Sequence, residues 1–123
     1  TLRDLARFGR LLLDGGVGAT GEQVLPRAWV DEMLRGGDPA LDVSEMGTVL
    51  AAPSYRNQVW HTGDEHACAF GVGIYGQFVW MNPATDTVVA KLSTLDQADA
   101  EAPFAAHVEL LDRLSRAQPC RSG

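Results

Sequence analysis

The sequence predicts an α+β fold, in which an antiparallel sheet from the middle of the chain carries helices from its two ends. Near both termini, apolar residues recur at three- and four-residue steps, as they do along one side of a helix. The central stretch 55–93 is instead rich in β-branched and aromatic residues that alternate between two faces. Helices before and after a run of strands indicate separate layers, and we expect both terminal helices to pack on one side of the sheet.

Residues 1–14 predict the first helix. Thr1 suits the N-cap position, and Asp4 three residues later completes a variant of the capping box. The glycines at 15 and 16 end the helix in the way that C-terminal glycines do. Its expected apolar stripe consists of Leu2, Leu5, Ala6 or Phe8, Leu12 and Leu13.

Two further helices are predicted. The first is short and covers 26–34, since a proline at its start suits the first helical position. Its inward side is expected to hold Trp29, Val30 and Met33. The second covers 98–117, with basic residues near its C-terminus where the helix dipole favours them. Its apolar stripe consists of Phe104, Val108, Leu111 and Leu114.

Three strands are predicted, over 55–61, 71–81 and 87–93, and the residues 82–86 join the last two by a turn of Asn, Pro and Asp type. Side chains of a strand alternate, so the second strand divides into two sets. One set is Ile74, Phe78 and Trp80, and the other is Tyr75, Val79 and Met81. Both sets are apolar, which indicates that this hairpin lies in a covered sheet.

Three glycines, Gly71, Gly73 and Gly76, stand near the start of that second strand. Glycine weakens a strand, and it often marks a bulge or a place where another backbone or a ligand comes close. One interpretation is a β-bulge that bends the strand. The other is an oxyanion hole, in which a backbone N–H reaches a reacting carbonyl oxygen without a side chain in the way. From the residues alone the bulge is the simpler interpretation, and both stay open.

Composition limits the partners of the chain. Its 123 residues suffice for one small domain, and the net charge of −6 with a pI of about 4.8 argues against nucleic acid or an anionic membrane. No apolar run reaches the length of a membrane span. Cys68 and Cys120 form no metal or redox pair; two free thiols are favoured over a single bridge, which favours a cytoplasmic location. The first residue is not Met, so a targeting signal could lie upstream.

The polar residues suggest little chemistry by themselves. His61, His66 and His107 follow no metal-binding pattern, so we expect neither a metal ion nor another cofactor. His66 is expected to be solvated and His107 to be a partly buried structural residue. Lys91 and Ser93 share one face of a strand, but no neighbouring base or glycine elbow supports a nucleophile there.

Several segments carry a family resemblance. They are Thr-Leu-Arg-Asp-Leu-Ala-Arg-Phe-Gly at 1–9, Pro26 with Trp29-Val30, Tyr-Arg-Asn-Gln-Val-Trp at 55–60, and Gly-Ile-Tyr-Gly-Gln at 73–77 with Asn82-Pro83, Val88-Val89 and Lys-Leu-Ser at 91–93. Together they resemble the C-terminal part of the serine β-lactamase-like hydrolases, which include class C β-lactamases, penicillin-binding proteins and related esterases. The closest likeness is to the 6-aminohexanoate-dimer hydrolases. The resemblance implies a β-lactamase/transpeptidase-like fold.

Hydrolases of this superfamily use a Ser-x-x-Lys nucleophile motif and a second motif that contains a tyrosine. No serine of this chain has a lysine three residues later, and Tyr55 and Tyr75 lie within other matched segments. The resemblance therefore implies that residues 1–123 are the C-terminal segment of a single domain whose nucleophile-bearing part lies upstream. That domain would cleave an amide or ester bond of a small molecule. The alternative is a truncated relative that acts as a non-catalytic binding or oligomerisation module.

The third motif of these hydrolases lies on a strand and has two candidate positions here, His-Thr-Gly at 61–63 and Gly-Val-Gly at 71–73. The second directly precedes the matched segment 74–77. With that alignment, the resemblance implies that the backbone N–H of Ile74 is an oxyanion-hole donor, and the glycines then favour the oxyanion interpretation over a bulge. The implied substrate-binding residues are Trp60, Gly73, Tyr75 and, as a weaker match, Asp99.

Overall fold

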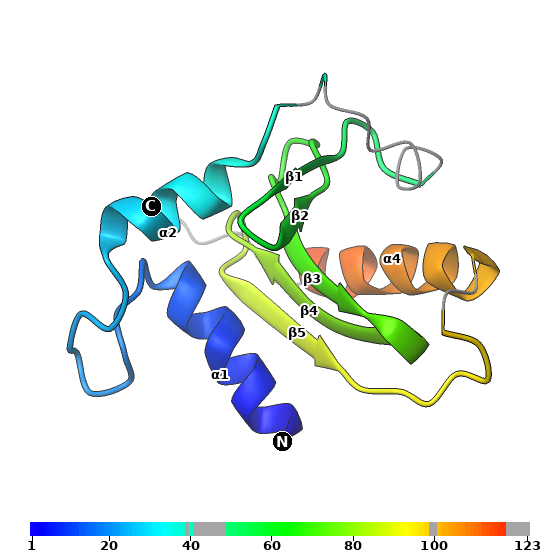
Figure 1. Cartoon of the computed structure of the whole chain (residues 1–123), viewed down its shortest axis with the longest axis horizontal. Coiled ribbons are helices and arrows are strands. Elements are labelled where there is room, and N and C mark those ends of the chain that lie inside the picture. The colour runs from blue at the N-terminus through cyan, green and yellow to red at the C-terminus, as the bar shows by residue number, and fades with distance from the viewer. Residues whose placement is uncertain (39, 41–48, 99–100, 118–123) are drawn as a thin grey trace.

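The computed structural model describes residues 1–38, 40, 49–98 and 101–117, and these form an α+β fold (Figure 1). The helices are α1 (Leu2–Leu13), α2 (Arg27–Arg35) and α4 (Glu101–Arg116). The strands are β1 (Ser54–Arg56), β2 (Val59–His61), β3 (Ala69–Gly73), β4 (Gln77–Asn82) and β5 (Thr87–Lys91), with a short 3-10 turn, Ile74–Gly76, between β3 and β4. The predicted antiparallel sheet with helices from both chain ends is confirmed.

Neighbouring strands in the chain are also neighbours in the sheet, whose order is β1-β2-β3-β4-β5, and every pair is antiparallel. Two of the predicted strands are in fact hairpins. The first turns at Asn57 and Gln58, whose φ values of 49° and 69° are those of a tight hairpin turn. The second turns at Ile74–Gly76. Neither turn carries the usual Asn-Gly or Asp-Gly signal, which is why the strand pattern runs through both without a break.

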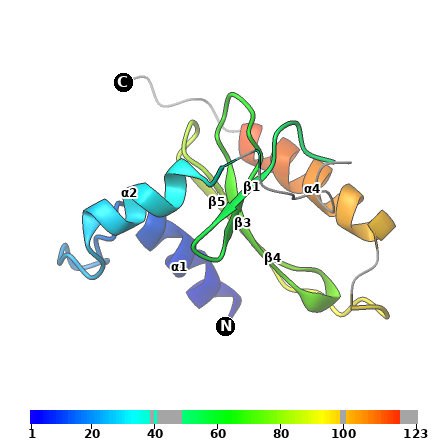
Figure 2. The ribbon, with the colours of Figure 1, turned by 45° about the horizontal axis from the view of Figure 1, so that its top comes forward.

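The two sides of the sheet carry different helices (Figure 2). Helices α1 and α2 cover one face, where the core holds Leu12, Val30 and Met81, whereas α4 covers the other. The expectation that both terminal helices share one side is wrong. The alternation along β4 explains why, since Phe78 and Trp80 pack toward α4 while Met81 packs toward α1 and both faces are apolar.

Helix α1 begins as predicted, with the Thr1 side chain and Asp4 forming a capping box. Its packing face differs from the predicted stripe. Leu2 and Phe8 are 47% and 48% exposed, while Gly9 is buried against β4 and β5. Helix α2 buries Val30 and Met33 as predicted, but Trp29 is 43% exposed.

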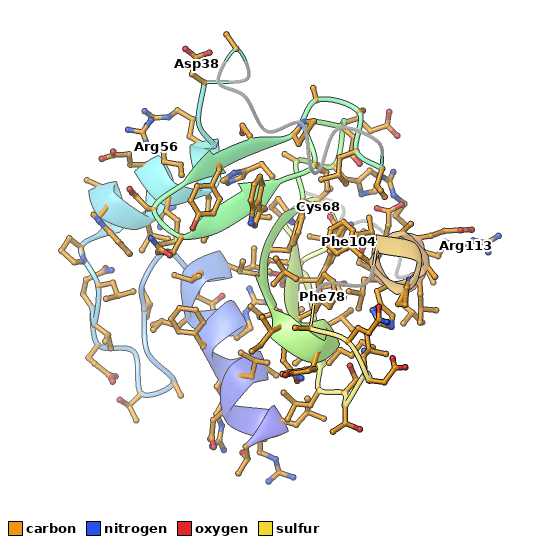
Figure 3. All side chains as sticks on the ribbon, turned by 45° about the vertical axis from the view of Figure 1, so that its right-hand side comes forward. Asp38, Arg56, Cys68, Phe78, Phe104 and Arg113 are labelled. Carbon is orange, nitrogen blue, oxygen red and sulfur yellow. The ribbon has the colours of Figure 1, made fainter. Side chains whose placement is uncertain are left out.

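Helix α4 seals the second core. Its Phe104 stacks on Phe78 of β4 with ring centroids 5.9 Å apart, in the apolar cluster that also holds Cys68 (Figure 3). Val108 and Leu111 are buried as predicted, but Leu114 is 47% exposed, and the fully buried position is Ser115.

Ser115 can be buried because its hydroxyl forms hydrogen bonds with two core side chains. It accepts hydrogen bonds from the Trp80 Nε1–H at 3.3 Å and from the Asn82 amide at 3.1 Å. The same Asn82 contacts Nδ1 of His66, which is half-buried rather than solvated as predicted. The hydroxyl of Ser115 and the amide of Asn82 are thus paired with one another inside the core.

Cys68 is a buried free cysteine, and burial raises the pKa of its thiol to about 12. A protonated, covered thiol of this kind is inert, while Cys120 lies outside the described residues. Within the described ranges, no helix is long and apolar enough to cross a membrane, and no group of acidic, His or Cys side chains is arranged to hold a metal ion.

Candidate active site

The C-terminal end of β3 has two positions without side chains, Gly71 and Gly73, which leave the backbone uncovered there. Gly71 is half-buried and Gly73 is exposed, and both face the side of the sheet that α1 and α2 cover. Helix α1 packs mainly on β4 and β5 and α2 on β2, whereas β2 pairs with β3 only at Ala69 and Phe70, before the glycines. The β3–β4 ladder runs from Ala69 opposite Met81 to Gly73 opposite Gln77 without a skipped residue. The β-bulge interpretation is therefore wrong for Gly71 and Gly73, while Gly76 lies in the turn that follows β3.

The turn that follows β3 has an unusual backbone. Tyr75 has a φ of 60°, a left-handed conformation that costs a residue with a side chain about 1–3 kcal/mol. Gly76 also has a positive φ, of 81°, and is buried. The Tyr75 N–H donates to the carbonyl of Ala98 at 3.0 Å, and its carbonyl accepts from the N–H of Leu95 at 3.3 Å. The loop after β5 thus holds the turn from one side, and both views place that loop beside it (Figures 1 and 2).

Ile74 is the first residue of the turn and is open to solvent. The residue is 65% exposed. Among the backbone hydrogen bonds of the described turns and loops, none uses the Ile74 N–H as donor. Within the described turns and loops, the Ile74 N–H is thus without a backbone acceptor.

Three side chains, Gln77, Lys91 and Ser93, hold the same turn from β4 and the end of β5, and we call them the turn clamp. The Ser93 hydroxyl lies 2.8 Å from the carbonyl oxygens of both Tyr75 and Gly76. The Lys91 ammonium donates to the Gly76 carbonyl at 2.9 Å and to Ser93 Oγ at 2.7 Å. Gln77 binds Ser93 through both ends of its amide, accepting from the Ser93 N–H at 3.1 Å and donating to its carbonyl.

Lys91 and Ser93 are within reach of one another, but their hydrogen bonds do not make Ser93 a nucleophile. The hydroxyl proton points to backbone carbonyls, and Lys91 donates to Ser93 Oγ instead of accepting from it. An activated serine needs a neighbouring base that takes its proton. Strand alternation places these two residues on one face, but their contacts with the turn join residues up to 18 positions apart and have no local sequence signal.

His107 of α4 lies next to Gly76 of the turn. It is half-buried, and its ring meets Phe78 edge-on with centroids 5.7 Å apart. A Cβ atom at Gly76 would lie 3.2 Å from this ring and 2.6 Å from Ser93 Oγ, which explains why only glycine fits there. Burial and, to a lesser degree, the positive charge of Lys91 lower the pKa of His107, so the neutral ring is favoured.

The structure brings some of the predicted site residues together. Gly73, Ile74 and Tyr75 are consecutive: Gly73 ends β3, and the other two lie in the turn. Trp60 lies on β2, opposite Phe70, and its ring packs against Tyr55 with centroids 4.6 Å apart. Since Phe70 is four residues before Ile74, Trp60 is separated from the turn by about 13 Å of strand. Asp99 lies outside the described residues.

The other candidate for the third motif, His61-Thr62-Gly63, is packed into the protein. His61 and Thr62 are only 6% and 3% exposed. Burial lowers the pKa of His61, and the nearby backbone of Ser54 and Met33 opposes this only in part. A Cβ atom at Gly63 would lie 2.0 Å from the carbonyl oxygen of Ala52, so this glycine also serves close packing.

A cavity of about 660 Å³ opens on the α4 side of the sheet, away from the turn. Its lining includes Leu50, Thr62, Asp64, Trp80, Val108 and Asp112. Trp60 and the residues of the β3–β4 turn do not line it.

Comparison with known proteins identifies the family. The beta-lactamase family model matches residues 1–113. The chain belongs to the beta-lactamase family. The expected β-lactamase-like fold is confirmed, as is the likeness to 6-aminohexanoate-dimer hydrolases that follows from two further matches.

The first is the 6-aminohexanoate-dimer hydrolase of Paenarthrobacter ureafaciens, which is 46% identical over 101 residues that make up 80% of this chain. The second is a solved structure from Bacillus anthracis, assigned as a 6-aminohexanoate-dimer hydrolase, which is 26% identical over 97% of this chain with a TM-score of 0.66. This chain spans 25% of the length of the first protein and 30% of the second.

Proposed function

We propose that this chain is the C-terminal part of a serine hydrolase that cleaves amide or ester bonds in small molecules, with Ile74 supplying a backbone N–H to the oxyanion hole. The observation that carries the proposal is that the Ile74 N–H has no backbone acceptor among the described turns and loops and lies next to the exposed Gly73. The likeness to 6-aminohexanoate-dimer hydrolases supports an amide substrate.

In the proposed reaction, a serine from the upstream part of the enzyme attacks the substrate carbonyl. The carbonyl oxygen becomes an oxyanion, which accepts hydrogen bonds from the Ile74 N–H and from the N–H of that serine. Donors held in place where charge develops stabilise the transition state more than the ground state. The amine or alcohol then leaves, and water hydrolyses the acyl-serine intermediate. Trp60 and Tyr75 would shape the substrate pocket.

The buried state of His61 and Thr62 supports Gly71–Gly73 as the third motif, because an oxyanion donor must be accessible to substrate. In this arrangement β3 leads straight into the turn that bears Ile74. The alternative, a non-catalytic binding module, is separated from the proposal by the activity test that follows.

The test removes one N–H from the full-length enzyme. We expect Ile74→Pro to lower kcat about 100-fold or more, since this is the usual cost of one lost oxyanion donor. Gly73 has φ and ψ of −121° and 161°, an extended conformation that the residue before a proline prefers, so the preceding residue accommodates the change. The assay follows hydrolysis of the linear 6-aminohexanoate dimer and of p-nitrophenyl butyrate.

A sharper variant replaces Ile74 by its α-hydroxy acid, which turns the N–H into an ester oxygen and keeps the side chain. The matched control makes the same change at Thr20, an exposed loop residue, and should retain full turnover. If the folded Ile74 variants remain as active as the parent, the oxyanion role is refuted. If His61→Ala instead abolishes turnover in a folded protein, the third motif lies at 61–63.

A further inference from the structure

We propose that the turn clamp of Gln77, Lys91 and Ser93 positions the Ile74 N–H for catalysis, an inference that rests on the proposed function. These three are positioning residues: none contacts the reacting atoms in the proposed mechanism. They act by holding the carbonyl groups of Tyr75 and Gly76, the two residues that follow the donor.

The peptide planes around the donor are held one after another. Gly73 is fixed because it pairs with Gln77 at the end of the β3–β4 ladder. The next amide after the donor, that of Tyr75, binds the Ala98 carbonyl at 3.0 Å. The carbonyls of Tyr75 and Gly76 then bind the clamp. Among the described turns and loops the Ile74 N–H has no backbone acceptor, whereas the polar groups that follow it are paired.

The clamp is needed because the turn conformation is strained. Tyr75 holds a left-handed φ of 60° that its side chain disfavours, so the turn would relax unless other contacts fix it. Ser93 is the centre of the clamp, since its hydroxyl reaches both carbonyls and its main chain is held by Gln77. Lys91 adds a third hydrogen bond and places a positive charge behind the Gly76 carbonyl.

A turn held in this way gives a pre-organised donor. An oxyanion-hole N–H is effective only when it already points at the developing charge, because reorganisation during the reaction would consume the gain. Loosening the clamp should therefore weaken binding of the transition state and leave binding of the substrate unchanged. Such a change appears as a fall in kcat with an unaltered KM.

The experiment compares Ser93→Ala, Ser93→Thr and Lys91→Met in the full-length enzyme. We expect Ser93→Ala to lower kcat about tenfold, a fraction of the roughly 100-fold effect of losing the donor itself, with KM unchanged. Affinity for a boronic acid, which forms a tetrahedral adduct with the serine, should fall by a similar factor. Ser93→Thr keeps the hydroxyl and should restore turnover, and Lys91→Met should have a smaller effect than Ser93→Ala.

The matched control is Ser54→Ala, which removes a buried hydroxyl that accepts a hydrogen bond from the Gly37 N–H at 3.1 Å, away from the turn. It should lower thermal stability without lowering kcat. Amide exchange of the Tyr75 N–H should quicken in Ser93→Ala and not in the control.

The outcomes separate the two proposals. If the Ile74 ester loses turnover while folded Ser93→Ala and Lys91→Met keep theirs, the clamp inference is overturned and the proposed function stands. The inference is also overturned if Ser93→Ala raises KM with kcat unchanged, or if Ser93→Thr fails to restore turnover. If the Ile74 ester keeps full turnover, the proposed function and the inference fall together.

Discussion

His61 shows how a single buried side chain can make stability depend on pH. Neither of its ring nitrogens has a hydrogen-bond partner among the described residues, and the residue is 6% exposed. Burial disfavours the charged imidazolium, which lowers the pKa of His61 below its ordinary value of 6.5. The unfolded chain then binds more protons than the folded one in the interval between the two pKa values.

We therefore expect the free energy of unfolding to fall as the pH drops below about 6.5, and to stop falling once the pH is below the folded pKa of His61. His107, whose pKa is also lowered, should add to the same trend. His61→Leu removes the titrating group and should reduce this dependence, with stability at neutral pH changed by less than about 1.5 kcal/mol. Urea unfolding at a series of pH values measures this, and an undiminished slope in His61→Leu would contradict it.

At the scale of elements, α1 meets the sheet through a glycine. A Cβ atom at Gly9 would lie 2.7 Å from a methyl group of Val88 and 2.9 Å from one of Val79. The helix can approach β4 and β5 closely only because this position has no side chain. Periodicity directed the predicted stripe to larger apolar residues and did not indicate that a glycine was the point of contact.

Two effects oppose one another at Gly9. Gly→Ala in an ordinary helix interior stabilises by about 1 kcal/mol through helix propensity, whereas overpacking a core costs about 1–3 kcal/mol. The distances to Val79 and Val88 decide for the second, so Gly9→Ala should lower the free energy of unfolding. Urea unfolding is the measurement. Val88→Ala makes room for the added methyl, so the double variant should lose less than the sum of the two single losses; strict additivity would contradict the proposed contact.

At the scale of the whole molecule, several large apolar side chains are exposed. The chain is also far shorter than the relatives it matches. Those at least two-fifths exposed include Leu2, Phe8, Val24, Trp29, Ile74, Tyr75, Leu92, Leu110 and Leu114. The match spans 25% of the length of the Paenarthrobacter hydrolase. Where such side chains form a contiguous patch, they mark a contact with another chain segment or protein.

We expect the native polypeptide to have a mass well above the 13.2 kDa of this chain, with the additional part covering some of these side chains. Mass spectrometry of the polypeptide from its source measures this directly. Residues 1–123 expressed alone should bind a hydrophobic dye or self-associate. A native mass equal to that of this chain, or a monomer that binds no dye, would contradict the prediction and favour the non-catalytic module.

The sequence by itself determined the features that depend on near neighbours in the chain. The capping box of Thr1 and Asp4, the end of α1 at its glycines, the turn at 82–86 and the antiparallel strands follow from local hydrogen bonding and side-chain alternation. The family also follows from the sequence, because each matched segment is a short run of neighbouring residues that can be recognised without the fold. The Ile74 N–H could be singled out as a donor from those segments, and its role stays a prediction.

Only the tertiary structure decided which surfaces meet. Two hairpin turns, at 57–58 and 74–76, place Asn57, Gln58, Tyr75 and Gly76 in left-handed backbone conformations. Neither turn has the usual hairpin sequence, so single strands were expected there. The faces of β4 are equally apolar, and only packing assigns α1 to one and α4 to the other. The turn clamp joins residues up to 18 positions apart, and no local pattern encodes such a contact. Local chemistry selects the elements, and long-range packing places the groups that would form the site.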